Sequence, residues 1–575
     1  MCGIAGVFGA DASTDTLERM SDCLVHRGPD DAGVYRDDPA GLAHRRLSII
    51  DVEGGDQPQF NESDSVALVY NGEIYNYQRL REELRSAGHD FSTDSDTEVI
   101  IHGYEEYGVD VLERIEGMFA FALWDRDRER FFLARDRLGI KPLVLARTDG
   151  QVAFASETAA LLDGPVDLGG LDDTAVAQYF AFGFVPAPRS IFENARKLQP
   201  GEYALVSDAG VRYDQYYRPS VASRSPSLEA AASELRGRVE RSIEDRLMAD
   251  VPLGAFLSGG IDSSVVVGTM ANLREEPVRT FTVGFEEERF DETWAARTVA
   301  EYHDTDHHEY TVSADDVREL IPDVLGRLGE PFADQSLVPT TVVADRTSDS
   351  VKVALSGDGA DELFAGYDKY RGEYFSRYYR AFPRPFRQRV VEPLVESLPA
   401  DRTTATGERI RKVRKFLRGG EPDPVRRHYE WLRIPGGSAG DALAVDADAA
   451  GIERVGEAHE DVREWLPTDR QDALGLMGAA DTAFVLPNQM LTKVDQASMA
   501  NSLEVRVPFL DTAVVEYAMS LPTEHKITAR DSKRVLKRAF EDVLPPEILE
   551  RDKQGFDMPI GAWFRTALHD EFRSL

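Results

Sequence analysis

The chain has 575 residues but only two cysteines, Cys2 and Cys23. Two cysteines cannot form the disulfide framework of a small secreted domain, and the Cys/His spacings of zinc motifs are absent. Runs of about 18 apolar residues are absent too, and the N-terminus lacks the charged and then apolar stretch of an export signal. These absences predict a protein that stays in the cytoplasm and does not cross a membrane.

Basic residues are also scarce relative to acidic ones. The chain carries 66 Lys and Arg against 102 Asp and Glu, a formal net charge of -36. Binding to the phosphate backbone of nucleic acid or to an anionic membrane requires clusters of positive charge, so we expect neither partner and favour small-molecule substrates. Acidic pairs such as Asp30-Asp31 are scattered along the chain. They predict an acidic surface whose self-repulsion a salt-rich cytoplasm would screen.

Apolar patterning divides the chain into two halves. In the first half, strand patterns alternate with helical ones, which predicts a layered α/β sandwich. The strand patterns cover 4–8, 66–70, 119–124, 131–134, 151–155 and 203–207, and the helical patterns cover 77–87 and 97–106. A stretch with Pro219, Pro226 and several serines follows. We therefore expect a first domain over 1–216, a linker over 217–227 and a second domain over 228–575.

The second half begins with an amphipathic helix pattern over 228–247. Buried-strand patterns follow at 251–257, 280–285 and 351–355, and the first of them precedes a loop at 258–264 and a helix at 265–273. A strand, a loop, a helix and a strand in this order are typical of a parallel sheet. From Asp361 onward the pattern is mostly helical. The sequence thus predicts a parallel-sheet α/β domain with a helical lobe.

The first residues of the chain, Met1-Cys2-Gly3, carry a chemical signal. Removal of Met1 would leave a cysteine with both a thiol and a free α-amine. Thiols attack as thiolates, and an α-amine with a pKa of about 8 can accept the thiol proton near neutral pH. This arrangement favours acyl transfer with Cys2 as the nucleophile. The alternative is a small apolar cysteine that opens a buried strand.

Polar clusters downstream supply groups that would hold an amino-acid amide. They lie at 26–30, 45–49, 70–76 and 95–98. Arg46 can bind a carboxylate through two guanidinium N–H groups, and Asp96 can pair with an α-ammonium. The Asn71 side chain and the Gly72 backbone N–H could form an oxyanion hole. Because Asn-Gly is also the strongest signal for a type I′ hairpin, we expect a turn here that aims both donors.

These residues resemble the class II glutamine amidotransferases, whose processed N-terminal cysteine hydrolyses the side-chain amide of glutamine and releases ammonia. The resemblance covers the first domain and implies an Ntn-hydrolase-like fold, with Cys2 as the nucleophile and Asn71 and Gly72 at the oxyanion. Because the α-amine would supply the base, we interpret His26 as structural and Cys23 as a core residue of a helix. The implied glutamine-binding residues are Arg46, Asn71, Gly72, Glu73 and Asp96.

A glycine loop opens the second domain. The segment 256–264 reads Phe-Leu-Ser-Gly-Gly-Ile-Asp-Ser-Ser, follows a strand pattern and precedes a helix pattern. Backbone N–H groups and the helix dipole bind phosphate in this setting. The Walker A pattern, with its lysine for phosphoryl transfer, is missing. The segment instead resembles the pyrophosphate loop of ATP pyrophosphatases, which activate a carboxylate as its adenylate; a glycine turn capped by serine is the alternative.

A second glycine loop, at 356–364, also follows a buried strand pattern. Its clustered carboxylates suggest Mg2+, which prefers oxygen ligands that it shares with phosphate. Further along come Lys493-Val494-Asp495, the segment 504–511, Ser532-Lys533 and the segment 553–556.

This series, in this order, resembles the glutamine-hydrolysing asparagine synthetases, and the resemblance covers nearly the whole chain. The family forms a β-aspartyl adenylate from aspartate and ATP and attacks it with ammonia delivered through an internal tunnel. The resemblance implies glutamine, aspartate and ATP as substrates and Mg2+ as cofactor, and it leaves a homodimer open. The implied ATP contacts are Leu257, Ser258, Gly259, Gly260, Ile261, Asp262, Ser263, Ser264, Val283, Ser356, Gly357 and Lys493, and the implied metal ligands are Asp262 and Asp361.

The chain departs from the family in two places. Asp358 stands where some members carry glutamate, so the catalytic role implied in adenylate formation and amide transfer falls to a carboxylate that is one methylene shorter. The chain also ends at Leu575, soon after the segment 559–564, where many relatives continue. We expect this ending to affect the stability or assembly of the helical lobe.

Other interpretations explain less of the sequence. The nearest alternative is an amidotransferase of the same architecture with a different carboxylate acceptor. A ligase without glutaminase activity would not need Cys2, a sugar-phosphate or phosphoribosyl amidotransferase would not need the pyrophosphate loop, and a non-catalytic protein would need neither. His303, His307 and His308 do not match a zinc motif, and we expect a surface loop there. The basic run 409–418 predicts an amphipathic helix rather than an RNA site.

Overall fold

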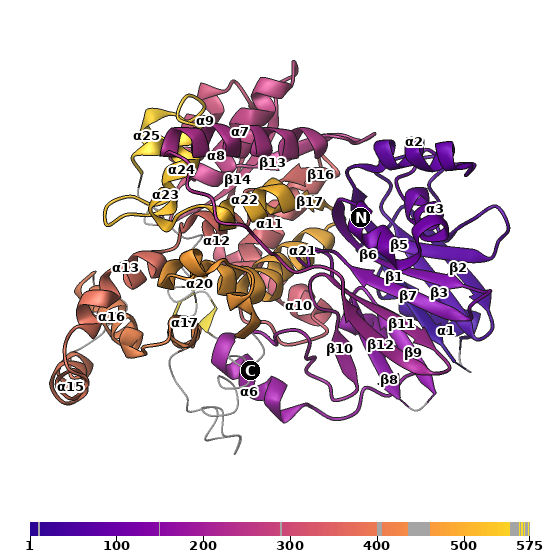
Figure 1. Ribbon diagram of the computed structural model, residues 1–575, viewed down its shortest axis with the longest axis horizontal. Helices are drawn as coiled ribbons and strands as arrows, with labels where there is room; N and C mark the ends of the chain where they lie inside the picture. Colours follow the sequence, from indigo (N-terminus) through magenta and orange to yellow (C-terminus); the bar gives the residue numbers. More distant parts are fainter. Residues whose placement is uncertain are drawn as a thin grey trace.

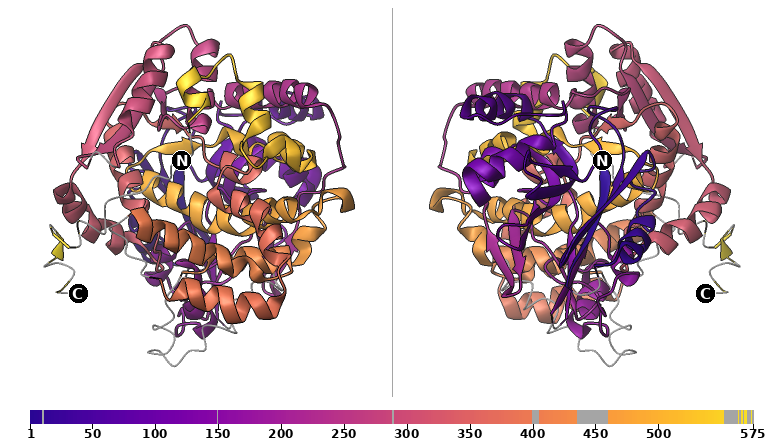
Figure 2. Two further views of the ribbon diagram at one scale, coloured as in Figure 1. Left: turned by 90° about the vertical axis from the view of Figure 1, so that its left-hand side faces the viewer. Right: turned by 90° about the vertical axis from the view of Figure 1, so that its right-hand side faces the viewer.

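The computed structural model describes residues 1–9, 12–148, 150–287, 290–398, 405–434, 460–551, 563, 565–566, 568–569 and 573. It has an N-terminal half built on antiparallel sheets and a C-terminal half built on a parallel sheet and many helices (Figure 1). The N-terminus lies between the two halves in Figure 1 and near the centre of both views in Figure 2, and Met1 is only 2% exposed. None of the helices that the structure describes combines the length and apolar character needed to cross a bilayer.

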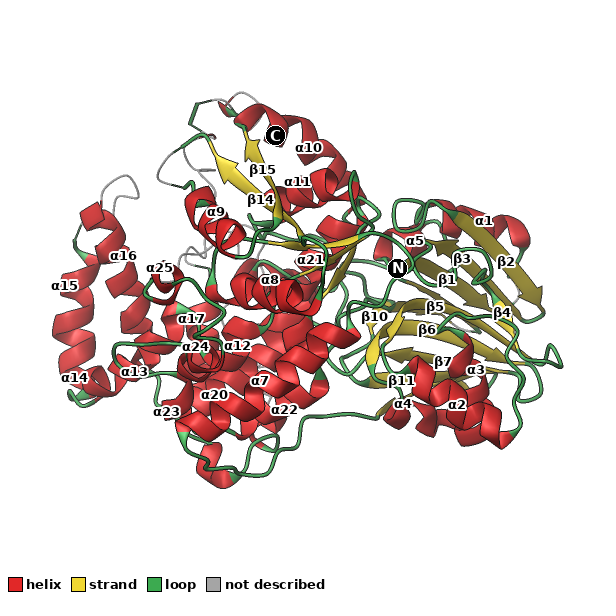
Figure 3. Ribbon diagram, turned by 90° about the horizontal axis from the view of Figure 1, so that it is seen from above, coloured by secondary structure: helices red, strands yellow, loops and turns green. Residues whose placement is uncertain are grey.

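The N-terminal half contains two six-stranded sheets, which stack between two layers of helices (Figure 3). One sheet has the order β10-β8-β9-β1-β3-β2 and the other β12-β11-β7-β6-β5-β4. The strands are β1 Cys2–Phe8, β2 Asp31–Asp37, β3 Ala40–Arg46, β4 Gln59–Phe60, β5 Val66–Ile74, β6 Gly117–Asp125, β7 Arg130–Arg135, β8 Val144–Thr148, β9 Gln151–Ala155, β10 Ala195–Lys197, β11 Glu202–Ser207 and β12 Gly210–Gln215. The helices are α1 Thr14–Asp22, α2 Tyr77–Ala87, α3 Glu98–Tyr107, α4 Val111–Arg114, α5 Thr158–Leu162 and α6 Asp173–Phe182.

The two-residue alternation of side chains explains this layering. Along β1, Ile4 and Phe8 pack into the core between the two sheets, whereas Ala5 and Val7 pack into the core under the outer helices α1 and α5. Strand β6 alternates in the same way, because Phe119, Phe121 and Leu123 face the helix side and the residues between them face the other sheet. Both faces of the inner strands β1 and β6 are therefore buried, as the layered α/β prediction requires, whereas the edge strands β2 and β12 are partly exposed.

The C-terminal half has a five-stranded parallel sheet of order β15-β14-β13-β16-β17. Its strands are β13 Leu253–Phe256, β14 Arg279–Phe285, β15 Asp306–Val312, β16 Val353–Leu355 and β17 Glu504–Arg506. The helices near the sheet are α7 Leu228–Asp245, α8 Ile261–Leu273, α9 Thr293–Tyr302, α10 Ala314–Arg327, α11 Leu337–Ser348 and α12 Ala360–Phe364. The later helices are α13 Asp368–Arg380, α14 Arg384–Phe386, α15 Glu392–Glu396, α16 Ala405–Leu417, α17 Pro424–Leu432, α20 Ala473–Ala480, α21 Leu491–Met499, α22 Thr512–Ser520, α23 Thr523–Lys526, α24 Arg534–Ala539 and α25 Pro546–Leu549. Among them, α21 packs against α11 and β17, and α22 and α24 pack against α7.

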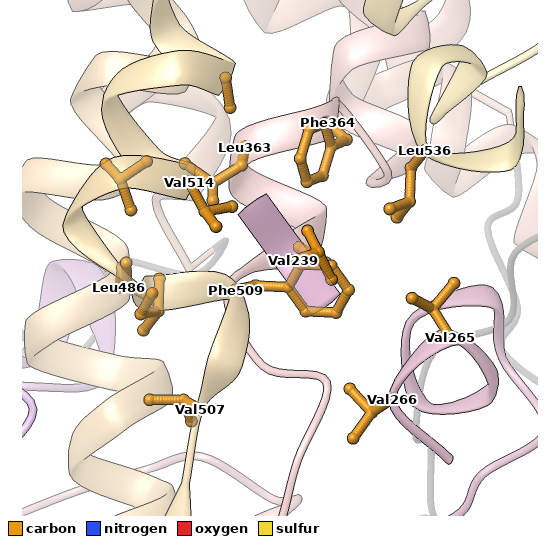
Figure 4. Close-up of a cluster of buried hydrophobic side chains, with 14 of the residues drawn as sticks. Val239, Val265, Val266, Leu363, Phe364, Leu486, Val507, Phe509, Val514 and Leu536 are labelled. Carbon is orange, nitrogen blue, oxygen red and sulfur yellow. The ribbon is translucent and has the colours of Figure 1, made fainter. Parts of the chain in front are cut away.

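One hydrophobic cluster joins the two halves. It contains Met1, Leu47 and Met118 from the N-terminal half together with side chains around the parallel sheet and the lobe. Figure 4 shows its central part, where helix α7, helix α8, the segment after β17 and helix α24 meet; the labelled side chains are Val239, Val265, Val266, Leu363, Phe364, Leu486, Val507, Phe509, Val514 and Leu536. The apolar interior is therefore continuous from the N-terminus to the parallel sheet.

The structure confirms the predicted mixed α/β class and corrects several local predictions. Residues 258–264 were predicted as a loop, but α8 already begins at Ile261, because the chain turns at Gly259 with a φ of 68° and the helix starts two residues later. The histidines at 307 and 308 lie in strand β15 rather than in a surface loop, because this edge strand pairs with β14. The predicted helix at 409–418 corresponds to α16. The segments 553–556 and, apart from Trp563, the family stretch 559–564 lie outside the described residues.

Candidate active sites

Cys2 opens strand β1 in a buried position between the two halves. Its side chain and backbone are only 7% exposed, and its backbone N–H donates to Asn71 Oδ1 at 2.9 Å. Burial raises the pKa of the Cys2 thiol, while the nearby N-terminal ammonium and Arg46 act in the opposite direction. The thiol therefore depends on positive charge beside it to become a thiolate.

Asn71 and Gly72 lie inside strand β5, so the predicted hairpin turn is wrong. Strand β5 pairs with β6 along its whole length, with Asn71 opposite Ala120 and Gly72 opposite Phe119. The glycine is needed for close approach of two backbones rather than for a turn, because a Cβ on Gly72 would lie 2.2 Å from the Met118 carbonyl oxygen. Pairing of β5 with β6 therefore outweighs the turn propensity of Asn-Gly at this position.

Beyond its short pairing with β4, which ends at Leu68, the edge of β5 presents hydrogen-bond donors. The backbone N–H groups of Tyr70 and Ile74 donate to Gln57 Oε1 at 2.7 Å and to Asp96 Oδ2 at 2.9 Å. Because every second N–H in a strand points the same way, the Gly72 N–H faces this edge between them. Asn71 Nδ2 is buried and has no hydrogen-bond partner among the described residues. The edge therefore offers a side-chain donor beside Cys2 and a backbone donor on the next residue.

Glu73 lies on the same face of β5 as Asn71 and contacts the C-terminal half. Its Oε2 accepts from Arg506 Nη2 at 2.9 Å, whereas its buried Oε1 has no hydrogen-bond partner in the part of the chain that the structure describes. Burial raises the pKa of Glu73 well above its usual range, and neither the opposing effect of Arg506 nor that of the N-terminal ammonium cancels it. The free oxygen faces a site that a polar substrate group would satisfy.

Arg506 also connects Glu73 to the N-terminus through Glu504. Its Nε donates to Glu504 Oε1 at 2.6 Å, and Glu504 Oε2 accepts from the Met1 ammonium at 3.1 Å. Burial alone would raise the pKa of Glu504, but Arg506, the N-terminal ammonium and Lys141 lower it to about 2. Strand β17 of the parallel sheet thus provides both a cation and an anion to the surroundings of Cys2.

The other two predicted glutamine-binding residues lie beside the same strands. Arg46 is the ladder partner of Cys2, and its guanidinium binds the loop at 51–56, including Asp56 Oδ1 at 2.7 Å. Asp96 Oδ2 accepts from the Tyr70 hydroxyl at 2.8 Å. The two regions meet where the loop's Asp51 carboxylate accepts from the backbone N–H of residue 94 at 2.9 Å. The structure therefore gathers all the predicted glutamine-site residues around β3 and β5.

Arg27 is a site residue to which the sequence analysis assigned no role. It is fully buried, and its Nε donates to the Cys2 carbonyl oxygen at 3.2 Å. Its other nitrogens donate to both Asp495 oxygens, at 2.8 and 3.1 Å, and to Glu157 at 2.7 Å. Asp495 lies on α21, so Arg27 ties the backbone of Cys2 to the C-terminal half. Its position in the polar cluster 26–30 was the only sequence signal.

Two further residues of this region have local roles. The Nε2 atom of His26 lies 3.1 Å from both carboxylate oxygens of Glu157, which agrees with a structural role. Cys23 is half-buried at the end of α1 rather than in the core as predicted, because its thiol donates to Asp163 Oδ2 at 2.9 Å. Burial and this carboxylate raise the pKa of the Cys23 thiol to about 12, which makes it unreactive.

The two glycine loops meet at the carboxyl ends of neighbouring strands. The sheet order is β15-β14-β13-β16-β17. From β13 the chain adds β14 and β15 on one side, whereas β16 and β17 are added on the other side, so the strand order reverses between β13 and β16. Ligands of open α/β sheets bind at such a switch point. A Cβ on Gly357 would lie 2.8 Å from both the Asp262 Cβ and the Ser263 backbone nitrogen, so the loop after β16 touches the start of α8.

The first loop is organised by its own serines. Ser258 N donates to Ser263 Oγ at 3.2 Å, and Ser264 Oγ donates to the Gly260 carbonyl at 2.7 Å. Helix α8 begins at Ile261, so the N–H groups of its first turn point toward the loop and the helix dipole adds positive potential there. The arrangement suits the binding of a phosphate chain.

The predicted metal ligands Asp262 and Asp361 are bridged by a lysine. Lys533 Nζ lies 2.7 and 2.5 Å from the two Asp262 oxygens and also pairs with Asp361. Carboxylate oxygens that converge on one point are the donors that Mg2+ prefers, so the residues fit this ion. In the structure, however, the Lys533 ammonium provides the positive charge between them. The sequence analysis noted Ser532-Lys533 without giving the lysine a role.

A second cation beside the phosphate loop was also missed. Arg551 Nη1 donates to the Gly259 carbonyl at 3.1 Å, and its Nη2 pairs with Glu292 Oε1 at 2.6 Å. Only the fold brings residue 551 to residue 259, so no local pattern could have found it.

The remaining predicted nucleotide residues lie close to these loops. Leu257 follows β13 and is 1% exposed, and Val283 lies in the neighbouring strand β14. The Ser356 hydroxyl donates to Asp358 within the second loop, and the Ser356 backbone N–H donates to the Arg506 carbonyl at 2.9 Å. Lys493 lies on α21, two residues before Asp495. The structure thus gathers most of the predicted set, while Lys493 stands on the element that reaches Arg27.

A pocket lies between the two halves. Its walls include Ile140 and Phe184 from one half and Leu328 and Phe332 from the other. Glu157 and Asp495, the two carboxylates that bind Arg27, also line it. The interface beside Arg27 is therefore not solidly packed.

Comparisons with known proteins agree with this division of chemistry. Residues 1–217 match the family described as glutamine amidotransferase domain, and residues 234–575 match asparagine synthase. Glutamine-hydrolyzing asparagine synthetase 1 of Bacillus subtilis is 32% identical over 100% of this chain and 90% of its own length. The synthetase 1 of Arabidopsis thaliana is 30% identical over 99% of this chain and 80% of its own length.

Solved structures match more weakly. A glutamine phosphoribosylpyrophosphate amidotransferase from B. subtilis is 16% identical, covers 65% of this chain and 77% of that chain, and gives a TM-score of 0.31. The match to the synthase family covers more than half of the chain, and the relatives span all of it. The chain therefore belongs to the asparagine synthase family, with a glutamine amidotransferase domain at its N-terminus.

Proposed function

We propose that this chain makes asparagine from aspartate in an ATP-dependent reaction, using ammonia released from glutamine at Cys2. Family membership supports both halves of the reaction. The observation that carries the proposal is the chain of contacts from Cys2 through Arg27 to α21, together with the contacts of β17 to Glu73 and Ser356. We keep 1–216 as the glutaminase domain, 217–227 as the linker and 228–575 as the synthetase domain.

In the glutaminase half, removal of Met1 would give Cys2 a free α-amine. That nitrogen already lies 2.9 Å from Asn71 Oδ1, which would hold it in place. The amine takes the thiol proton, and Sγ attacks the side-chain carbonyl carbon of glutamine. Asn71 Nδ2 and the Gly72 N–H would stabilise the oxyanion. Ammonia leaves with the transferred proton, and water then hydrolyses the thioester to glutamate.

The substrate's polar groups would be held by charges around this centre. Arg46 would bind the α-carboxylate, after exchanging part of its present contacts with the loop at 51–56. Asp96 would bind the α-ammonium, and the unpartnered Oε1 of Glu73 would accept a further hydrogen bond. These roles explain why polar atoms without partners lie in a buried region next to Cys2.

In the synthetase half, the segment from Ser258 to Ser264 would bind the phosphates of ATP through backbone N–H groups. Leu257, Val283, Ser356 and Gly357 would contact the rest of the nucleotide. An aspartate β-carboxylate oxygen attacks the α-phosphorus, and pyrophosphate leaves. Ammonia then attacks the acyl carbon, and AMP leaves. We propose that Asp358 assists these steps and that Lys493 neutralises phosphate charge.

Asp262 and Asp361 would hold Mg2+, which when bound neutralises phosphate oxygens. Lys533 already binds both carboxylates, so its ammonium would also be close to the phosphates that the ion shares. The continuous apolar cluster that joins Leu47 and Met118 to the parallel sheet supports a dry internal route for ammonia, because protonation in water would remove its nucleophilic lone pair. Location in the cytoplasm fits two free thiols, and a homodimer stays a prediction.

The test separates the two sites. Cys2→Ala should abolish asparagine formation from glutamine while leaving formation from added ammonium intact, whereas Cys23→Ala should leave both intact. Intact-protein mass should show that Met1 is absent from the active enzyme. Pyrophosphate release with aspartate, compared with a panel of other carboxylic acids, checks the acceptor. Full glutamine-driven activity of Cys2→Ala, or silence toward aspartate, would contradict the proposal.

A further inference from the structure

A second group of titratable side chains lies in the N-terminal half, outside the surroundings of Cys2. It consists of Glu62 from the loop between β4 and β5, His89 just after α2, and His102 and Glu105 from α3. One donor atom each of Glu62, His89 and His102 lies within 4.8 Å of the other two. Glu105 Oε2 joins them, 2.8 Å from His102 Nδ1 and 3.7 Å from His89 Nδ1. Glu62 Oε2 lies 3.9 Å from His102 Nδ1.

Both imidazoles are oriented in the same way. Each directs Nδ1 toward the cluster and Nε2 toward an outer carboxylate: His102 Nε2 lies 3.6 Å from Glu98 Oε1, and His89 Nε2 lies 3.6 Å from Glu106 Oε2. Histidines that bind a metal almost always direct their second ring nitrogen to a carboxylate or carbonyl, and both outer carboxylates here lie just beyond hydrogen-bond distance of that nitrogen. The pattern is repeated on two histidines that are 13 positions apart and lie on different elements.

The acidic members are held so that one oxygen stays directed inward. Glu62 Oε1 accepts from the Asp90 backbone N–H at 3.2 Å, and Glu105 Oε1 accepts from Asn61 Nδ2 at 2.7 Å. In each case the Oε2 atom is the one that faces the histidines. The neighbouring protein therefore fixes the carboxylates without using the oxygens that point into the cluster.

Burial adds an independent observation. His102 is only 1% exposed, and its Nε2 has no hydrogen-bond partner in the part of the chain that the structure describes. The outer carboxylate Glu98 is itself fixed by four hydrogen bonds of 2.7 to 3.0 Å from the backbone and hydroxyls of Ser92 and Thr93. A buried imidazole between two oriented carboxylates is a favourable place for a cation that all three groups contact.

We propose that Glu62, His89, His102 and Glu105 form a binding site for one divalent transition-metal ion, with Zn2+ as the ion that fits best. Two imidazole nitrogens and two carboxylate oxygens are ligands that Zn2+ accepts in tetrahedral geometry at about 2.0 to 2.2 Å, which places neighbouring ligand atoms about 3.4 Å apart. Three of the six separations, 2.8, 3.7 and 3.9 Å, bracket that value, and the donor atoms of Glu62 and His89 lie within 4.8 Å of each other. Two carboxylates would neutralise the ion, and four protein ligands describe a structural site rather than a catalytic one.

The site would brace the part of the domain that carries a glutamine-site residue. Its ligands come from the β4–β5 loop, the end of α2 and helix α3, which hydrogen bonds from Asn61 to Glu105 and from Asp90 to Glu62 already join. Helix α3 begins at Glu98, two residues after Asp96. A bound ion would therefore fix the start of α3, and the inference does not depend on the proposed reaction.

A proton is the alternative cation at this place. Burial opposes a charge on His102, but Glu105 and Glu98 outweigh it and raise the pKa of His102 to about 9. An imidazolium that donates to Glu105 would explain the short contact between them without any metal. Metal titration distinguishes the two, because only a metal site takes up an ion in fixed stoichiometry.

The experiment uses the full chain with Cys2→Ala, which removes a thiolate that would chelate zinc, in excess Mg2+ to fill the site at Asp262 and Asp361. After treatment with a chelator, isothermal titration with Zn2+ should show one equivalent bound, and Co2+ should give the intense visible absorption of a four-coordinate site. His89→Gln and Glu62→Gln should each weaken binding at least about tenfold, and Glu106→Gln by less, since it only orients His89.

His308→Gln is the matched control, because its Nε2 also lies near a carboxylate, 3.4 Å from Asp306 Oδ1, but far from the cluster in sequence. It should leave the Zn2+ affinity unchanged. Zn2+ should also raise the melting temperature of the parent and not that of His89→Gln. Equal affinity in the parent, His89→Gln and Glu62→Gln, or no stoichiometric binding at all, would overturn the proposal and leave the imidazolium as the explanation. Glu62 is exposed, so its variant tests the site without risk to folding.

Discussion

At the scale of single residues, Asn71 uses its two amide atoms in different ways. Oδ1 accepts from Cys2 N, whereas Nδ2 is buried without a hydrogen-bond partner among the described residues. A buried donor left in this state costs about 1–3 kcal/mol. Such a cost is tolerated where a ligand later removes it, and the expected ligand here is the oxyanion formed during glutamine hydrolysis.

We expect Asn71→Asp to lower kcat for glutamine hydrolysis by about 100- to 1000-fold, because it keeps the acceptor for Cys2 N but replaces the donor with a negative oxygen. Ammonium-driven asparagine synthesis should be unchanged. Steady-state release of glutamate measures the first rate, and asparagine formation measures the second.

Asn76→Asp provides the matched control for this change. Asn76 also uses both amide atoms, donating to the Arg114 carbonyl at 2.8 Å and accepting from Glu116 N at 3.0 Å, but in a half-buried position just before α2. Its variant should hydrolyse glutamine at nearly the parent rate. If Asn71→Asp matched that control, the oxyanion role of Asn71 would be wrong.

At the scale of elements, the neighbouring elements α21 and β17 provide the C-terminal residues that bind Arg27, the N-terminus and Glu73. Helix α21 provides Asp495 to Arg27, and strand β17 provides Glu504 to the N-terminus and Arg506 to Glu73. The same strand pairs with β16, whose following loop begins at Ser356. A displacement of β17 would therefore alter both sites together.

We expect Arg506→Gln to lower the melting temperature strongly, because it leaves the buried Glu73 and Glu504 without their shared cation. Removal of one partner from a buried ion pair costs about 3–5 kcal/mol. Arg297→Gln is the control, since its pair with Glu309 is exposed and such pairs contribute about 0–1 kcal/mol. Differential scanning calorimetry of the three proteins measures the effect.

The double variant Arg506→Gln with Glu73→Gln sharpens this test. Neutralising Glu73 removes one of the two unpaired carboxylates, so part of the lost stability should return. A melting temperature of Arg506→Gln equal to that of the parent would show that the β17 network contributes little. A double variant less stable than Arg506→Gln alone would show that Glu73 has other stabilising partners.

The sequence predicted some elements well and others poorly, for physical reasons. Strand β9 and helix α2 have their predicted bounds, because buried apolar residues mark β9 and an amphipathic pattern marks α2. Strands β2 and β12 were missed, since their exposed and half-buried residues alternate without a strong apolar face. The turn predicted at Asn71-Gly72 was wrong, because pairing of β5 with β6 outweighed the turn propensity of these two residues.

The site residues also fall into those that the sequence could predict and those that it could not. Residues grouped in one motif, such as 258–264, could be found from sequence. Arg27, Arg506 and Lys533 could not be given roles, because their partners lie far away in the chain, as with Lys533 and Asp262. The cluster at 62, 89, 102 and 105 has no zinc-motif spacing, since three separate elements supply its members.

At the scale of the whole molecule, the excess of acidic residues sets how stability depends on salt. The net charge is -36, so the folded surface carries many carboxylates without a cationic partner to match them. The buried ion pairs, such as Arg427 with Glu373, are shielded from the solvent and respond little to added salt. The surface should therefore decide the sign of the salt effect.

We expect the melting temperature to rise from dilute buffer to molar potassium chloride. The screening length falls from about 10 Å at 0.1 M to about 3 Å at 1 M, so repulsion between surface carboxylates is largely removed in the compact state. Salt also weakens exposed pairs such as Arg36 with Asp38, but each contributes about 0–1 kcal/mol and acts over a shorter range. Calorimetry in potassium chloride, compared with sucrose of equal osmolality, isolates the ionic part. A flat or falling melting temperature would mean that the exposed ion pairs outweigh the repulsion of the excess carboxylates.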